Sequence, residues 1–135
     1  MAKQNRLVLG LDFGTESVRA LIVDLKGREL ASAVANFRHG QITETLPTTG
    51  QKLPSDYALQ HPLDWLDDSC RAVRKALRHA HVDGSRIVGI GVDFTSCTML
   101  PTKSDGTPLC TLKKFEKQPL AWPKLWKHHG AKSQT

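Results

Sequence analysis

The sequence lacks the features of a disulfide scaffold and of a membrane protein. Its three cysteines, Cys70, Cys97 and Cys110, are odd in number, widely spaced and without a Cys-x-x-Cys pair. No apolar run approaches the ~20 residues that a membrane-spanning helix needs. Zinc binding by the cysteines together with His128 and His129 is an alternative, although the paired ligand spacing of structural zinc sites is absent.

The sequence predicts no secretory leader. Met1–Arg6 passes directly into an apolar run, with neither the longer apolar block nor the small-residue cleavage site of a signal peptide. Because an odd set of separated cysteines suits a reducing compartment, we expect a cytoplasmic protein without a membrane partner.

Basic residues outnumber acidic residues in the sequence. The sequence has 19 lysines and arginines against 13 aspartates and glutamates, which gives a formal net charge of +6. The excess is concentrated in Arg71–Arg78 and Lys113–Lys132, so nucleic acid is an alternative partner. No helix-turn-helix, zinc-finger or RNA-binding motif organises this charge. A solvated helix face and a loose basic segment explain it, and we expect no nucleic-acid partner.

What the sequence does contain is a pair of apolar runs around a short polar segment. Leu7–Leu11 and Val18–Val23 predict two strands, and their nearly continuous apolar character is typical of strands covered on both faces. Asp12–Ser17 between them predicts a reversal with several unpaired backbone N–H groups at its tip. The 135 residues suffice for one modest domain with a core.

This reversal has the components of an anion site. Gly14 allows close approach to the backbone, and the hydroxyls of Thr15 and Ser17 lie nearby in the sequence. Asp12 repels phosphate but can hold the hydrated Mg²⁺ that accompanies a nucleoside triphosphate. Arg19 shares a face with Ser17 if the strand alternates, and could neutralise phosphate oxygens. An ordinary β-hairpin with a polar tip is the alternative.

Further elements follow in the sequence. Glu29–Asn36 predicts a third strand, which would complete an antiparallel meander. Phe37–Gln60 has no sustained period and predicts an extended loop, a kind of segment that is usually functional or mobile. Acidic residues early and basic residues late in Pro62–Ala80 predict an amphipathic helix. Arg86–Asp93 predicts a buried strand, and Pro108–Leu112 a short strand at the sheet edge.

Gly10–Ala20 resembles the first phosphate-binding motif of the FGGY carbohydrate kinases. Three further segments resemble, within this family, the ribulokinases: Ser55–Trp65, Gly89–Thr102 continued by Asp105–Leu109, and Lys124–His129. The resemblance implies an α/β fold, the ribonuclease-H-like N-terminal subdomain of the actin/hexokinase/Hsp70 ATPase superfamily. Such a subdomain has a mixed sheet with an antiparallel three-strand start and a packed helix.

The resemblance also implies ATP and Mg²⁺ as cofactors and assigns the residues of the opening motif to them. Asp12 would organise the Mg²⁺, through water. Gly14, Thr15, Ser17 and Arg19 would hold the ATP phosphates.

A second group of residues would meet the sugar. Ser96 and Cys97 follow a strand end and would border it, Trp126 would offer an apolar wall, and Lys127 and His128 are weaker candidates. Each main candidate has a structural alternative: Ser96 would cap a turn, Cys97 would be buried, and Trp126 would fill the core.

The reaction implied by the resemblance is ATP-dependent phosphorylation of the 5-hydroxyl of L-ribulose, in arabinose catabolism. Another pentulose, such as D-ribulose or L-xylulose, and a non-catalytic binding or assembly module of the same fold are alternatives. FGGY kinases are several times longer than 135 residues, and no aspartate here matches the family's base motif. We therefore expect residues 1–135 to form part of the N-terminal kinase domain, without the rest of domain I or domain II. We expect no catalytic base and negligible activity in this chain alone, and the full-length enzyme could be a homo-oligomer.

Overall fold

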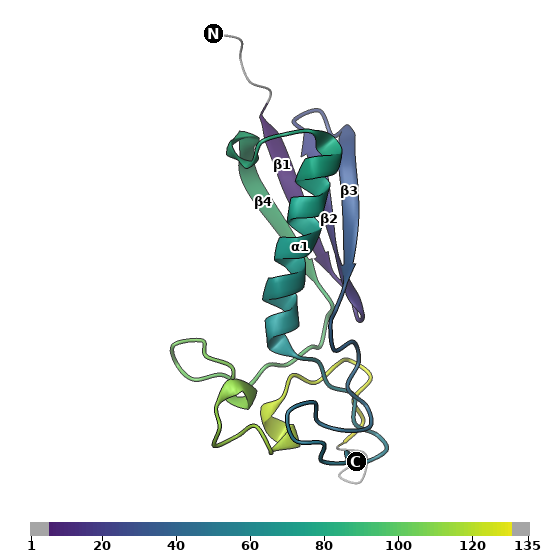
Figure 1. The fold of residues 1–135 in the computed structure, drawn as a ribbon, viewed down its shortest axis with the longest axis vertical. Helices are drawn as coiled ribbons and strands as arrows, with labels where there is room; N and C mark the ends of the chain where they lie inside the picture. Colours follow the sequence, from purple (N-terminus) through teal and green to yellow (C-terminus); the bar gives the residue numbers. More distant parts are fainter. Residues whose placement is uncertain (1–5, 131–135) are drawn as a thin grey trace. The chain divides into compact units, whose positions relative to one another are not determined.

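The computed structural model describes residues 6–130, so the leader prediction for Met1–Arg6 lies almost wholly outside the described residues. The chain divides into two compact units. The first consists of Met1–Arg38 with Asp64–Phe94, and the second of His39–Leu63 with Thr95–Thr135. Figure 1 draws both in sequence colours.

The first unit contains one four-stranded sheet in the order β3-β2-β1-β4. Its strands are β1 (Leu7–Phe13), β2 (Ser17–Asp24), β3 (Glu29–Asn36) and β4 (Ile87–Phe94). β2 is antiparallel to both β1 and β3, and β4 is parallel to β1 (Figure 1). The predicted antiparallel start and mixed sheet are confirmed.

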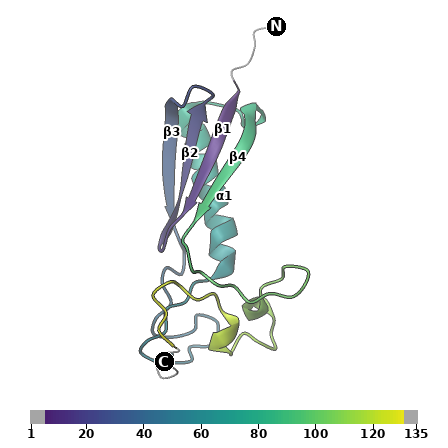
Figure 2. The same ribbon diagram turned by 180° about the vertical axis from the view of Figure 1, so that it is seen from behind.

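One helix, α1 (Pro62–Ala80), lies across one face of this sheet, as the front and back views agree (Figures 1 and 2). Its ends match the prediction. Asp64 stands in the first turn and Arg78 in the last, where each charge suits the helix dipole. Ala72 and Ala76 are fully buried in the core between helix and sheet, and their small side chains let the two approach closely.

The expectation of strands covered on both faces is wrong for the described residues. Along β2, Val18, Ala20 and Ile22 are fully buried while the intervening Arg19 is exposed. On β4, Ile90 is 64% exposed. The physical reason is that α1, the one α-helix among residues 6–130, packs on a single face of the sheet (Figure 2) and does not cover the edge strand β4.

The second unit has a core but, apart from Pro62 and Leu63 at the start of α1, no strand or α-helix in its described residues. Isolated β-bridges and two short 3₁₀ turns, η2 (Leu109–Thr111) and η3 (Pro119–Ala121), organise it. The Phe37–Gln60 segment is irregular as predicted, yet it supplies Leu46 and Leu59, both fully buried, to this core. From His39 onward, the segment is therefore a packed part of the second unit.

The short strand predicted at Pro108–Leu112 is wrong, because this segment contains η2. The Pro108 carbonyl accepts hydrogen bonds from the Thr111 N–H, at 3.2 Å, and from its hydroxyl, at 2.8 Å. These bonds close a turn where a strand would leave the carbonyl free for a neighbouring chain. Elsewhere in the fold, a bilayer-crossing helix is not found among residues 6–130.

Candidate functional site

The reversal between β1 and β2 is shorter than the sequence predicts. Asp12 and Phe13 continue β1, and Ser17 already begins β2. Phe13 extends the strand because its ring is buried and stacks on Phe94 of β4, with ring centroids 4.8 Å apart. Asp12 consequently projects from a strand, and its position is fixed by the sheet.

The backbone of this reversal is partly occupied. The Gly14 N–H donates to the Ser17 carbonyl at 2.9 Å, and the Glu16 carbonyl accepts the Phe37 N–H at 2.8 Å. A Cβ at Gly14 would lie 3.4 Å from the Ser17 oxygen, so glycine fits this tight turn. The prediction of several unpaired N–H groups therefore fails at Gly14.

A cavity of about 430 Å³ lies beside this reversal, within the first unit. Its lining includes Gly10, Asp12, Arg19, Gly91 and Asp93. Gly10 and Gly91 are partners across β1 and β4, and because neither has a side chain the cavity reaches the backbone between them. Asp12 and Arg19 alternate with buried residues along their strands, so they project on the face away from α1.

Three charged residues line this cavity. Asp12 is the cross-strand partner of Arg19 on one side and of Asp93 on the other. The Asp93 carboxylate accepts the Phe94 N–H at 2.9 Å. Asp12 and Asp93 are both exposed, and two neighbouring carboxylates repel each other unless a cation lies close. This donor set fits a hydrated Mg²⁺, which prefers carboxylate oxygens and water.

Asp93 is the residue that the sequence analysis missed. A signal for it exists: β1 and β4 both end in Asp-Phe, at Asp12-Phe13 and Asp93-Phe94, after an apolar run. Two parallel strands with the same ending, paired in register, place their carboxylates side by side.

Of the five residues predicted to hold Mg²⁺ and phosphate, two line the cavity. Asp12 and Arg19 are brought together there, whereas Gly14, Thr15 and Ser17 belong to the adjoining turn and strand start and do not line it. Ser17 does share the face of Arg19, as predicted from strand alternation.

The predicted sugar-binding residues belong to the second unit. Ser96 and Cys97 form a tight turn directly after β4, and both are exposed. Cys97 has φ 60°, a conformation that non-glycine residues rarely adopt and that concentrates at functional sites. Trp126 is 57% exposed, whereas Trp122 is fully buried. The alternatives of a buried Cys97 and a core-filling Trp126 are therefore wrong.

His128, a weaker sugar candidate beside the half-buried Lys127, has structural contacts. Its Nδ1 accepts the Ala58 N–H at 3.2 Å, and its ring meets Tyr57 edge-on at 4.5 Å. Burial, followed by the charge of Lys124, lowers the pKa of His128. A neutral imidazole is the form that accepts this hydrogen bond.

The zinc alternative has no support in the described residues. Between residues 6 and 130, neither the three cysteines nor the His128-His129 pair joins a group of three or more potential metal ligands. Cys110 is buried, and that burial raises the pKa of its thiol to about 11, away from the thiolate that metals require.

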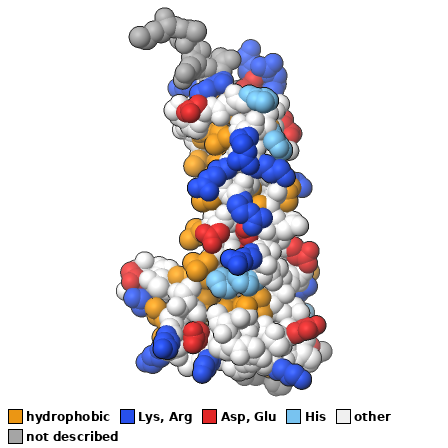
Figure 3. Space-filling view, viewed as in Figure 1, with side chains coloured by type: hydrophobic (Ala, Val, Ile, Leu, Met, Phe, Trp, Pro, Cys, Tyr) orange, Lys and Arg blue, Asp and Glu red, His pale blue; other side chains and the backbone are white. Residues whose placement is uncertain are grey.

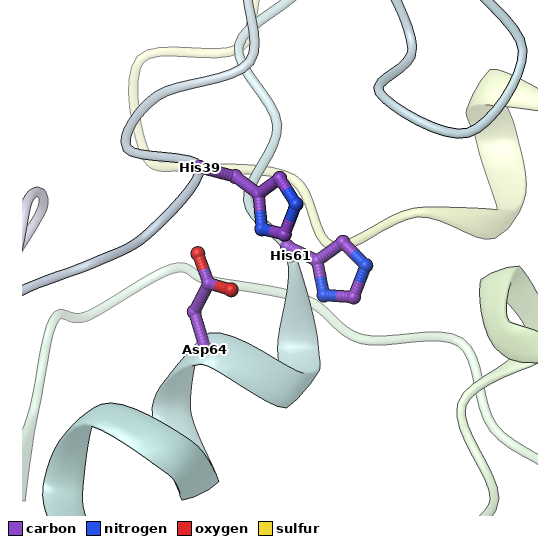
Figure 4. A group of neighbouring side chains, drawn as sticks. All are labelled: His39, His61 and Asp64. Carbon is purple, nitrogen blue, oxygen red and sulfur yellow. The ribbon is translucent and has the colours of Figure 1, made fainter. Parts of the chain in front are cut away.

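Figure 4 shows a pair of stacked histidines in the second unit. The rings of His39 and His61 have centroids 4.4 Å apart and planes inclined by 17°. Asp64, drawn with them, belongs to the first turn of α1. Two imidazoles are half the ligand set of a structural zinc site, so the pair carries no metal assignment.

Comparison with known proteins identifies similar sequences. Residues 7–129 match the N-terminal domain of the FGGY family of carbohydrate kinases. A ribulokinase from Halalkalibacterium halodurans is 46% identical over 131 residues, and one from Mycolicibacterium smegmatis is 48% identical over 132. Each alignment covers 96% of this chain and 23% of the relative. The chain thus spans about a quarter of the length of the curated relatives it matches.

Solved structures share the fold. A xyloylose kinase from Brucella ovis superposes with a TM-score of 0.71 at 19% sequence identity, covering 93% of this chain and 22% of that one. A gluconate kinase from Lactobacillus acidophilus gives a TM-score of 0.70 at 18% identity, covering 97% and 22%. At these identities the likeness supports the fold alone.

Proposed function

Because the chain belongs to the FGGY family of carbohydrate kinases, we propose that it supplies the phosphate-binding part of a kinase that phosphorylates the 5-hydroxyl of L-ribulose. The observation that carries this proposal is the cavity that Asp12, Arg19 and Asp93 line together with Gly10 and Gly91. The choice of sugar comes from the ribulokinases that the chain resembles at 46% and 48% identity.

The residues of this cavity would bind and orient ATP. Phosphoryl transfer needs mainly positioning and neutralisation of the charge that spreads over the transferred oxygens. Asp12, joined by Asp93, would hold Mg²⁺ through water, and the ion would neutralise part of the phosphate charge. The Arg19 guanidinium would donate to phosphate oxygens from the adjoining strand. Gly10 and Gly91 would leave room for the phosphates to approach the sheet.

The second unit would contribute the sugar contacts. The Ser96 hydroxyl would donate to a sugar hydroxyl, and the exposed turn at Cys97 would border it. Trp126 would pack its exposed ring against the sugar carbons. We assign the catalytic base to no residue of this chain, and we expect the 135 residues alone to have negligible turnover.

A chimera tests the proposal. This chain replaces the aligned 131 residues of the Halalkalibacterium halodurans ribulokinase, and ADP release is followed with and without L-ribulose. We expect L-ribulose-dependent turnover, and a loss of about 100-fold or more for Asp12→Asn. Asp67→Asn, an exposed aspartate of α1, is the matched control and keeps the activity.

A folded chimera without turnover, or an Asp12→Asn chimera with full activity, would contradict the proposal. A panel with D-ribulose and L-xylulose completes the assay. A higher kcat/KM for either sugar than for L-ribulose would correct the substrate.

A further inference from the structure

A groove of about 280 Å³ runs between α1 and β3 in the first unit, and the proposed kinase chemistry does not use it. It is lined by Val34 and Ala35 of β3 and by Arg71, Arg74, Lys75 and Arg78 of α1. Figure 3 shows lysine and arginine side chains gathered over the helix on this side.

The four basic side chains share one helix face. Their spacing of three, four and seven residues from Arg71 brings them together, over ~10 Å of the helix axis. β3 is an edge strand, so backbone groups on its outer side are not used in the sheet. The contact of 3.4 Å between His79 Nδ1 and the Ser32 carbonyl shows that the end of the helix lies along this edge.

Most of the positive charge in the groove is uncompensated. Arg71 pairs with the buried Asp68, which also accepts the Arg38 N–H. In the described part of the chain, Arg74, Lys75 and Arg78 form no ion pair. Like charges at these spacings repel one another along a helix. A bound anion would remove this repulsion.

We propose that this groove is a binding site for a small anion that carries two or three linked phosphate groups. A guanidinium group can donate two parallel hydrogen bonds to phosphate oxygens. Arg74 and Arg78 lie one helical turn apart on α1, and Lys75 lies between them in the sequence. The groove lies between α1 and the outer edge of β3, and it shares no lining residue with the cavity of Asp12 and Arg19. The site is therefore separate from the proposed ATP site.

The dimensions favour a small ligand over a nucleic acid. Binding to a nucleic-acid strand uses an extended basic track together with aromatic side chains that stack on the bases. The lining of this groove contains no aromatic residue, and its charges occupy about two helical turns.

The test is calorimetric titration of sodium tripolyphosphate into the 135-residue chain, in low salt with EDTA so that no metal ion contributes. The double variant Arg74→Gln/Arg78→Gln should weaken binding at least tenfold. Lys113→Gln/Lys117→Gln removes the same charge from exposed lysines elsewhere and should change the affinity less than twofold. Arg71 is left intact because Asp68 depends on it. Thermal unfolding checks that each variant is folded.

Undetectable binding of tripolyphosphate overturns the proposal. Equal losses of affinity in the two double variants also overturn it, because they indicate general charge attraction. Titrations with pyrophosphate and with ATP separate the sources of the same chemistry: binding of either that is lost in Arg74→Gln/Arg78→Gln supports the site. A single-stranded RNA oligonucleotide that binds tenfold tighter than tripolyphosphate, with the same dependence on Arg74 and Arg78, overturns the small-anion assignment.

Discussion

Asp12 of β1 lies directly opposite Arg19 of β2 in the antiparallel ladder. The pairing is set by the strand register, because Phe13 and Val18, the next pair along, are both buried. A shift of one residue in either strand would turn a buried side chain to the exposed face. The hydrophobic pattern of the hairpin therefore fixes the geometry of its charged pair.

The Asp12–Arg19 pair should contribute little to stability. Both side chains are exposed, and a cross-strand pair of opposite charges contributes at most ~1 kcal/mol. We expect Arg19→Gln to lower the free energy of unfolding by no more than that, measured by urea denaturation with far-UV circular dichroism. In the chimera the same variant should raise the KM for ATP. A loss of several kcal/mol with an unchanged KM would assign Arg19 a structural role instead.

Two isoleucines at one level of the sheet test whether β4 is covered. Ile22 and Ile90 both pair with Leu9, one from each neighbouring strand. Ile22 is fully buried and Ile90 is 64% exposed. Ile22→Ala should cost ~2–5 kcal/mol and Ile90→Ala no more than ~0.5 kcal/mol, measured by urea denaturation. Similar losses from the two variants would mean that β4 is covered in solution.

The sequence predicts the elements of the first unit because each has strong local signals. The apolar runs before Asp12 and within Glu29–Asn36 mark strands, and the charge distribution of Pro62–Ala80 marks the helix. Whether another element covers the sheet has no such local signal. An apolar strand such as β4 has the same sequence whether or not another element packs on it, so its exposure could not be predicted.

The candidate site was predictable only in part, for a similar reason. Asp12 and Arg19 are close in sequence, and a hairpin brings them together. Asp93 reaches Asp12 only through the parallel pairing of β4 with β1, a contact between residues far apart in the chain. The φ of 60° at Cys97 is likewise set by the fold, since no local signal such as glycine marks it.

The two neighbouring tryptophans should behave differently. Trp126→Ala should leave the melting temperature of the chain nearly unchanged because the side chain is 57% exposed. In the chimera it should raise the KM for L-ribulose more than the KM for ATP. Trp122→Ala, the control, removes a fully buried ring whose Nε1 donates to the Glu116 carbonyl at 3.1 Å, and should cost ~3–5 kcal/mol. An unchanged sugar KM in Trp126→Ala would exclude its role as a sugar wall.

His128 should make the stability of the chain depend on pH. Burial and the nearby charge of Lys124 lower the pKa of His128 below its ordinary value of 6.5. The imidazole of the unfolded chain therefore takes up a proton more readily than that of the folded chain. The contribution of His128 to the free energy of unfolding is complete above about pH 6.5 and is lost as the pH falls below that value. Melting temperatures from pH 8 to pH 5 measure this loss.

Two substitutions by asparagine separate His128 from the other histidines. The side-chain oxygen of His128→Asn can still accept the Ala58 N–H but does not titrate, so the acid loss should be smaller than in the wild type. His81→Asn is the control, since His81 is exposed and asparagine tolerates its φ of 53°. The melting temperature of His81→Asn should fall between pH 8 and pH 5 by as much as that of the wild type. The same pH profile in both variants would exclude His128 as the cause.

The most direct test of the phosphate-binding cavity is a titration of the ¹⁵N-labelled chain with MgATP, followed by the amide resonances of its glycines. We expect shifts at Gly10, Gly14 and Gly91, which line or adjoin the cavity, and none at Gly50 or Gly106 in the second unit. Replacing Mg²⁺ by EDTA, or Asp12 by asparagine, should reduce the shifts. MgATP that leaves Gly10 and Gly91 unmoved would contradict the assignment of this cavity.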